Sequence, residues 1–472
     1  MRATFVHPRH INLQGKQPVQ RETSLSATRL DLKAWLAGGL GFCCLMPYLA
    51  VAAGNNTAVQ FGAMLAMLIC LMVLATKGSS RSLLMFMLLI VPLCTSTTWV
   101  AISGQAALDV SMKNMIVYTM SLSAIVAAQF LAPGYGLAML TGAAIAAVIH
   151  FVVGMWQMVV FPSGEFPLLW LYSNPSFLSV QENAETIARW QRRPFGIFPE
   201  PSAMSSSLAP FLLLWSAELL GLVRYTATPA RWQRLLFAAG AIGGGGLIIV
   251  SQSGHAAITL FVLGMFVIAW FVRARATPAT LAAIVGLFVV VMPLVLWMAV
   301  NSLSKRVGGR SMGNSSWSDR SDSLVIGLKL WLVDDLPTII FGLGLGGTST
   351  ILQRDYGFEA IWSVLLTYIY ETGLFGLAAV IAVTCLLLRV WRSTGFDLVM
   401  AGIAFVWLVG ITITTSYTVL LSPWVTLGLL ASWAAVCVKV PARSLRPVIA
   451  ADRTPLNGEK QSFPWRQRWA AE

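Results

Sequence analysis

The chain has 472 residues, of which 57% are hydrophobic and only 11% are charged, and its mean hydropathy is +0.74. In soluble domains roughly a quarter of the residues are charged. The composition of this chain therefore excludes a soluble nucleic-acid binder, a secreted disulfide scaffold and a disordered chain. The formal charge of +13 needs no nucleic-acid partner, because lysine and arginine gather on the cytoplasmic loops of membrane proteins.

The apolar runs predict an all-α integral membrane protein with about twelve spans, since a membrane helix needs roughly 20 apolar residues. Residues 1–33 are polar and are expected to form a cytoplasmic N-terminal tail, and residues 439–472 a cytoplasmic C-terminal tail. Between them, residues 34–438 form the predicted membrane domain. The expected spans lie at 34–53, 59–76, 82–100, 115–132, 135–160, 202–223, 235–251, 255–272, 279–300, 361–388, 397–416 and 419–438.

Basic residues orient this arrangement. If both termini face the cytoplasm, most lysines and arginines lie on cytoplasmic pieces, as the positive-inside rule requires of an inner-membrane-type protein. Two long loops, 161–201 and 301–360, then face the periplasm. Long loops with polar residues are where such proteins place their functional groups, so these two loops are expected to carry the functional site.

The first periplasmic loop carries Arg189, Arg192 and Arg193 shortly before a helix that is expected to begin at Pro201. Proline suits the first helical position, and a helix start offers free N–H groups and a partial positive charge. Arginine recognises phosphate oxygens through a planar fork. The pattern indicates a site for the diphosphate of a lipid-linked sugar, with contact to lipid headgroups as the alternative.

Glu200 stands between Pro199 and Pro201, which keep the backbone extended and restrict where the carboxylate points. A carboxylate at the periplasmic membrane surface can remove a proton from an attacking sugar hydroxyl. The alternative is structural, because acidic residues are also favoured at helix starts. The sequence leaves both roles open.

The second periplasmic loop contains Arg310 and Arg320, and residues 323–333 are expected to form an amphipathic helix on the membrane surface. Its glycine-rich segment 342–347 lacks the lysine of a phosphate-binding P-loop. We therefore expect these glycines to allow a tight turn or the close approach of another backbone. The sequence offers no strong metal-binding cluster, and the acidic residues of this loop are expected to be solvated.

Some ionisable residues fall inside the expected spans. Glu371 lies well within the span at 361–388, where a charged group is costly unless it faces a polar cavity or a partner. It is expected either to pair with a loop arginine or to line the path of an acceptor. His150 and Glu218 are expected to make hydrogen bonds between helices. His255 differs because it stands at the periplasmic end of its span, beside the expected site.

Four short sequence elements follow one another along the loops and the spans beside them. They are RPFGIFPEPS at 193–202, SQSGH at 251–255, Arg320 with Trp331, Pro337 and Gly342-Leu-Gly344, and ETGLFGL at 371–377. The chain thereby resembles the O-antigen ligase/polymerase superfamily of bacterial envelope glycosyltransferases, whose corresponding patterns are R-x-x-G-x-F-x-E-P-S, S-x-S-R/G, R…W…P…G-x-G and E-x-G-L-x-G-L. The resemblance covers residues 190–380, and the expected topology agrees around it.

The chain departs from this family at two places. Many members, ligases above all, carry a His-Asn pair shortly before the glutamate of the last element. Here those positions are Trp362 and Ser363, so a histidine base is absent there, and Glu200 or Glu359 would replace it. At the other place, His255 stands beside the position where ligases often carry arginine.

The resemblance implies a membrane glycosyltransferase of the GT-C type. Its donor would be a growing glycan on undecaprenyl diphosphate, and its acceptor another lipid-linked repeat unit of an exopolysaccharide or O-antigen. Arg193 and Arg320 would neutralise the diphosphate leaving group, and Glu200 would activate the acceptor hydroxyl. No metal or other cofactor is implied; the implied partners are the lipid bilayer and a chain-length regulator or export protein. The residues expected to bind substrate are Arg192, Arg310, Ser202, His255 and Glu371.

Two alternatives remain. The first is an O-antigen ligase that transfers finished polymer to the lipid A core, against which the missing His-Asn pair argues. The second is a transporter or flippase of lipid-linked sugars. Transporters usually concentrate charges near the membrane midplane and keep their loops short, whereas this chain places arginines and carboxylates in two long loops.

Overall fold

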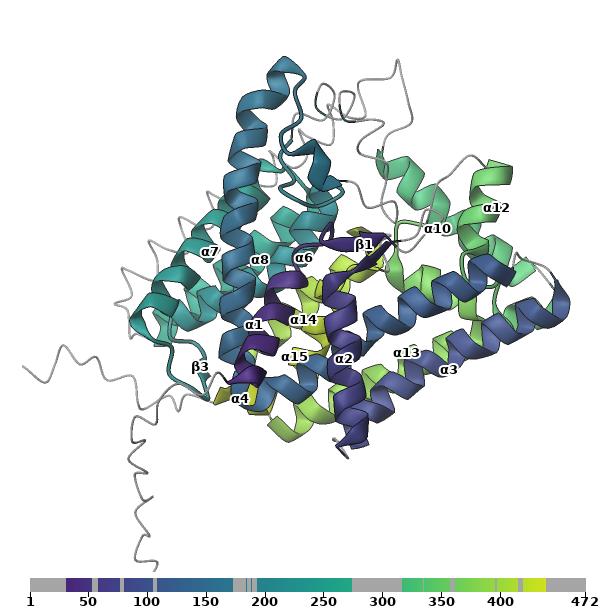
Figure 1. The fold of residues 1–472 in the computed structure, drawn as a ribbon, viewed down its shortest axis with the longest axis horizontal. Helices are drawn as coiled ribbons and strands as arrows, with labels where there is room; N and C mark the ends of the chain where they lie inside the picture. Colours follow the sequence, from purple (N-terminus) through teal and green to yellow (C-terminus); the bar gives the residue numbers. More distant parts are fainter. Residues whose placement is uncertain are drawn as a thin grey trace, which may run out of the picture.

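The computed structural model of the protein is a bundle of helices (Figure 1). Among the described residues, five helices are long and apolar enough to cross a membrane: Ser82–Ser103, Leu108–Ser163, Arg231–Val250, Gly254–Val272 and Val364–Ser393. This agrees with the predicted all-α membrane protein. The structure describes residues 31–52, 58–76, 80–104, 108–172, 184, 188, 193–273, 316–333, 335–356, 361–394, 397–414 and 419–438. The expected span at 279–300 lies outside them.

The helices and strands follow one another along the chain with few long connections in the described part. In the first half they are α1 (Leu32–Cys43), β1 (Ala50–Ala52), β2 (Ala58–Gln60), α2 (Phe61–Ala75), α3 (Ser80–Ser103), α4 (Leu108–Val160), the short 3-10 helices η1 (Phe161–Ser163) and η2 (Leu169–Tyr172), and α6 (Pro201–Leu219). In the second half they are β3 (Arg224–Tyr225), α7 (Arg231–Val250), α8 (Gly254–Arg273), α10 (Ser316–Val333), α11 (Leu336–Phe341), α12 (Gly347–Tyr356), α13 (Val364–Thr394), α14 (Leu398–Val409), the π-helix η3 (Gly410–Thr414), α15 (Ser422–Ala431), α16 (Trp433–Val436) and β4 (Cys437–Val438).

Helix α4 joins the two sides of the bundle. It bends at Pro133 and Gly134, where Gly134 has a φ of 152°, because proline breaks the helical hydrogen-bond ladder and glycine tolerates the bend. The two spans expected at 115–132 and 135–160 lie on either side of this bend. Helix α4 packs against α3 and also against α7, and Figure 1 shows α3 and α13 on the right and α6, α7 and α8 on the left.

Glycines bring α1 and α4 into close contact. A Cβ atom on Gly41 would lie 1.9 Å from the backbone oxygen of Met139, and one on Gly142 would lie 1.9 Å from that of Gly38. Small residues let membrane helices approach backbone to backbone, where no hydrophobic force drives them together. The second part of α4, which carries site residues, is therefore tightly fixed to α1.

The first and last expected spans are shorter as helices than the apolar runs predicted. Helix α1 ends at Cys43, and the chain then turns and pairs β1 antiparallel to β2, with Val51 opposite Val59. At the other end, α15 stops at Ala431 and only a short turn of helix follows. Hydrophobicity predicts that a segment is buried in a membrane or a core, but it does not fix where its helix ends.

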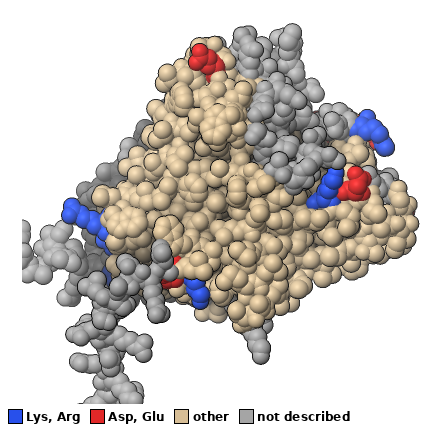
Figure 2. Space-filling model, viewed as in Figure 1, with Lys and Arg blue, Asp and Glu red and all other residues tan. Residues whose placement is uncertain are grey.

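The surface of the bundle is apolar. Ile102, Val159 and Ile242 are 74%, 76% and 76% exposed, and in Figure 2 the described charged side chains lie near the margins of a broad uncharged face. A soluble monomer rarely exposes such an area. The protein is therefore membrane-embedded.

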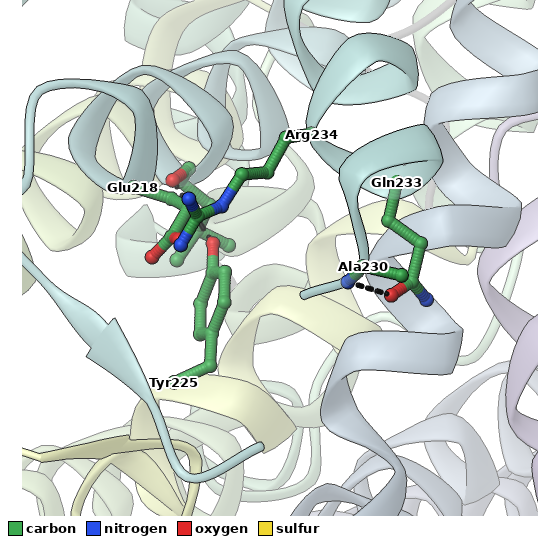
Figure 3. Close-up of polar contacts among 6 residues, drawn as sticks. Glu218, Tyr225, Ala230, Gln233 and Arg234 are labelled. Carbon is green, nitrogen blue, oxygen red and sulfur yellow. Dashed lines mark hydrogen bonds and ion pairs between the residues drawn. The ribbon is translucent and has the colours of Figure 1, made fainter. Parts of the chain in front are cut away.

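At one end of the bundle, polar contacts near β3 and β4 join the ends of neighbouring helices (Figure 3). These strands pair antiparallel, with Arg224 opposite Val438. Glu218 of α6 lies 3.8 Å from Arg234 of α7, and the backbone N–H of Ala230 donates to Gln233 at 2.8 Å. Glu218 thus links two helices, through an ion pair in place of the expected hydrogen bond. The pairing also brings the connection between α6 and α7 to the same end as β4.

Candidate functional site

The segment 193–200, in the first expected periplasmic loop, enters the protein core. Residues 194–199 are buried, and the side chains of Phe195 and Phe198 are 0% exposed. A non-helical segment in an apolar interior leaves its own N–H and C=O groups without helical partners, so side chains must supply those partners.

Gln157 on α4 supplies most of them. Its side-chain oxygen accepts the backbone N–H groups of Phe195 and Gly196, each at 3.0 Å, and its amide nitrogen donates to the carbonyl oxygen of Gly196 at 2.8 Å. Tyr172, which lies beyond the end of α4, donates to the same carbonyl. Burial raises the pKa of Tyr172, so its hydroxyl keeps the proton that it donates.

His150, which precedes Gln157 on α4, binds the backbone of Ile197, the residue after Gly196. Its Nδ1 accepts the backbone N–H of Ile197 at 2.9 Å, and its Nε2 lies 2.5 Å from the carbonyl oxygen of Leu45. Because the first partner can only donate and the second can only accept, the ring is neutral and carries its proton on Nε2. A Cβ atom on Gly196, whose φ is +56°, would lie 2.7 Å from Nδ1. His150 therefore hydrogen-bonds two non-helical stretches of backbone, instead of making the expected hydrogen bond between helices.

This anchored segment ends at Glu200, directly before α6. Glu200 occupies the N-cap position with an extended backbone (φ −159°, ψ 163°), and Pro201 is the first residue of α6, as predicted. The Glu200 side chain makes no capping bond to the backbone of that helix. Instead it accepts a hydrogen bond from the hydroxyl of Ser202. Glu200 is partly exposed, as is Arg193 at the start of the segment.

Behind Glu200, α6 makes a polar contact with the turn that joins α7 to α8. Ser205 lies 3.2 Å from Ser251 between their hydroxyl oxygens, and the backbone N–H of His255 donates to Ser253 at 3.3 Å. The His255 side chain is 0% exposed, and neither ring nitrogen has a hydrogen-bond partner in the described structure. The π-helix η3 passes beside it: a Cβ atom on Gly410 would lie 3.6 Å from its Cε1. Interruptions of this kind are frequent at functional sites.

Glu371 lies on α13, among a different set of helices. Its side chain is 2% exposed; one carboxylate oxygen accepts the N–H of Gly346 at 2.9 Å and the other the hydroxyl of Tyr118 at 3.0 Å. In the described part of the chain, no arginine pairs with it. The structure thus brings Glu200, Ser202 and His255 to the same end of α6 and α8, while Glu371 belongs to a separate cluster.

The side chains of the remaining predicted arginines lie outside the part of the chain that the structure describes. Arg192 and Arg310 lie outside the described residues, as does Glu359. Arg320 belongs to α10 by its backbone, and its side chain is not described. The expected meeting of Arg193 and Arg320 at one diphosphate therefore stays a prediction.

Sequence reasoning missed the residues that hold the site in place. Only Gln157 could have been recognised from the sequence, because its amide lies in an apolar run and a polar group inside a membrane needs hydrogen-bond partners. Tyr118 and Tyr172 gave no signal, because an aromatic residue in an apolar run is ordinary.

The chain matches no protein-family model, no curated protein and no solved structure.

Proposed function

We propose that the protein is a membrane glycosyltransferase that polymerises undecaprenyl-diphosphate-linked repeat units into an exopolysaccharide or O-antigen at the periplasmic face of the bacterial inner membrane. The observation that carries the proposal is the anchored segment 193–200. Its backbone is fixed from Phe195 to Ile197 by Gln157 and His150, so an arginine and a carboxylate stand at the two ends of a rigid, non-helical stretch. A reaction with an anionic leaving group needs both groups in fixed positions.

In this mechanism the acceptor hydroxyl attacks the anomeric carbon of the donor glycan. The new bond joins the acceptor oxygen to that carbon, and the bond that breaks is the one between the carbon and the diphosphate oxygen. Glu200 takes the hydroxyl proton, with Ser202 orienting its carboxylate. Arg193 and Arg320 neutralise the charge on the departing lipid diphosphate. The broken bond supplies the energy, so no nucleotide sugar is needed.

The other expected groups complete the proposal. In it, Arg192 and Arg310 bind the substrates together with Arg320 of the second periplasmic loop, and His255, whose side chain is buried, supports the acceptor site without touching the substrate. The proposal includes twelve spans in a GT-C-type arrangement with both termini in the cytoplasm, together with a chain-length or export protein as partner. The pairing of β3 with β4 supports this topology, because it brings to one end two segments that the topology assigns to the cytoplasmic side.

The test is complementation of a strain that lacks this chain, with the length of the surface polysaccharide as readout. Polymer loss with single units remaining indicates a polymerase, whereas full-length polymer that accumulates unattached indicates a ligase. Glu200→Gln should reduce polymer by at least about 100-fold with normal expression, because the amide cannot accept the proton. Glu165→Gln is the matched control, since Glu165 is an exposed acid of the same expected loop.

Substitution of the two arginines is a second test of the proposed function. Arg193→Lys and Arg320→Lys should both impair polymerisation, because a lysine ammonium cannot reproduce the two-pronged contact with phosphate oxygens. Reconstituted protein should lengthen lipid-linked units without an ion gradient, which separates a polymerase from a transporter. Full activity of Glu200→Gln, or of both lysine variants, would contradict the proposed roles.

A further inference from the structure

Helix α13 is interrupted directly after Glu371. Gly373 has a φ of 65° and a ψ of −150°, and the chain between α11 and α12 lies against this interruption. A Cβ atom on Gly373 would lie 2.4 Å from the backbone oxygen of Ile340, and one on Gly342 would lie 2.3 Å from the carbonyl carbon of Glu371. The N–H of Leu343 also donates to the carbonyl of Tyr370 at 2.9 Å. The two backbones are therefore in direct contact.

The glycine turn 342–347 is also tied to α4. The Ser111 hydroxyl donates to the carbonyl of Leu345 at 3.1 Å. Gly346 has a φ of +81°, and a Cβ atom there would meet the Asn114 amide at 2.3 Å. Its N–H points to the Glu371 carboxylate. A side chain larger than hydrogen at Gly346 would collide with Asn114 and Val110 of α4, so the turn would have to move away from that helix.

Glu371 connects these parts. Its two carboxylate oxygens accept from Gly346 and from Tyr118, while its backbone carbonyl accepts the hydroxyl of Ser96 on α3 at 2.6 Å. Burying an acidic side chain among apolar helices is costly unless donors compensate it. Here each oxygen has a donor supplied by the protein itself, and the side chain is 2% exposed.

Helix α10 packs against α11, which leads into this turn, and against α13. The indole N–H of Trp331 on α10 donates to the carbonyl of Ile339 on α11 at 3.1 Å, and the rings of Trp331 and Tyr370 lie 5.8 Å apart between centroids. A Cβ atom on Gly327 would lie 2.7 Å from the Tyr370 ring. The backbone of Arg320 is part of the same helix.

We propose that Glu371 is a positioning residue: by accepting the N–H of Gly346 it fixes the glycine turn, and through it α10 with Arg320, against α13. The part of this inference that concerns Arg320 rests on the proposed function. Glu371 does not touch the substrate. What its position requires is a hydrogen-bond acceptor, and neither a negative charge nor a transferable proton is needed.

Two substitutions separate these requirements. Glu371→Gln keeps an oxygen for Gly346 and offers its amide N–H groups to the Tyr118 oxygen, whereas Glu371→Leu keeps the approximate volume and removes the acceptor. The full-length proteins are reconstituted in nanodiscs, and backbone hydrogen exchange is followed in 340–356 and, as an internal reference, in 193–205. The same variants are tested for polymer length in the complemented strain.

Glu371→Gln should leave exchange in 340–356 within about threefold of wild type and should restore polymer, while Glu371→Leu should raise that exchange by about tenfold or more and abolish polymer. Exchange in 193–205 should stay unchanged in both. If Glu371→Leu does not accumulate, Tyr118→Phe serves instead. It removes the hydrogen bond that holds the Glu371 carboxylate toward Gly346, so exchange in 340–356 should rise by a few fold.

Two results would overturn the inference. One is an inactive Glu371→Gln with wild-type exchange, which would mean that the charge acts on substrate. The other is unchanged exchange in Glu371→Leu, or in Tyr118→Phe where that variant is used. Failure of the proposed function gives a different pattern. The strain then makes the same polymer with or without the wild-type chain, yet Glu371→Leu still raises hydrogen exchange in 340–356. That result supports the positioning role alone.

Discussion

The two non-helical segments, 193–200 and 342–347, solve the same problem in different ways. Each brings unpaired backbone groups into an apolar bundle, where water cannot satisfy them. The first is held from outside by neutral side chains of α4, with Gln157 alone serving two N–H groups and one carbonyl. The second is held by direct backbone contact with α13 and by one carboxylate. The first therefore depends on hydrogen bonds from side chains, whereas the second combines glycines that admit a neighbouring backbone with hydrogen bonds to the side chains of Glu371 and Ser111.

The two segments also differ in how they use an acidic residue. Glu200 lies at the end of its segment, is partly exposed and accepts from a neighbouring serine. Glu371 is buried, and the hydrogen bonds that hold it come from distant parts of the chain. An acid that takes part in a reaction must be reachable by substrate, whereas an acid that holds a fold works best when its oxygens are fully engaged. Exposure is thus what separates the roles proposed for the two glutamates.

The largest effect is expected for Gln157→Leu. The substitution leaves two buried N–H groups, of Phe195 and Gly196, without their partner, which should cost about 4 kcal/mol of stability and abolish polymer formation. The thermal midpoint in detergent micelles and the complementation assay measure the two effects. Gln129→Leu is the matched control on the same helix, because the Gln129 amide is buried and donates to the weak acceptor sulfur of Met85. An equal loss in both variants would show that Gln157 does not anchor the segment.

In the second segment, Gly342→Ala should cost about 3 kcal/mol, since the new Cβ both strains a positive φ and meets the Glu371 backbone. Gly221→Ala is the control: Gly221 also has a positive φ, of +66°, but nothing lies within 4 Å of its Cβ position. It should cost about 1 kcal/mol. The difference between the two melting midpoints measures the crowding together with the strain of the Gly342 backbone, whose ψ is 177°. Equal midpoints would argue against close contact between the turn and α13.

Local features of both segments were predictable from the sequence, and their partners were not. Pro201 predicted the start of α6, and the glycines of 342–347 predicted a tight turn or a close backbone approach, both of which the structure confirms. Apolar runs predicted α3, α7, α8 and α13. Of the two expectations for Glu371, the acceptor path stays a prediction, and in the part of the chain that the structure describes its partners are Tyr118 and Gly346 in place of an arginine. Periodicity and composition report burial, but they do not report which distant groups pair inside it.

The smallest effect is expected for Tyr172→Phe. It removes one donor to the Gly196 carbonyl and the acceptor of one Gln157 amide N–H. Both partners keep the hydrogen bond between the Gln157 amide and the Gly196 carbonyl, so the loss should be about 1 kcal/mol. Tyr225→Phe removes a similar bond, from a buried tyrosine to the carbonyl of Leu214, at the far end of the bundle near β3. The two variants should lower the melting midpoint alike, yet only Tyr172→Phe should shorten the polymer, because only it loosens the segment that ends at Glu200. Equal polymer lengths would mean that the rigidity of 193–200 does not limit the reaction.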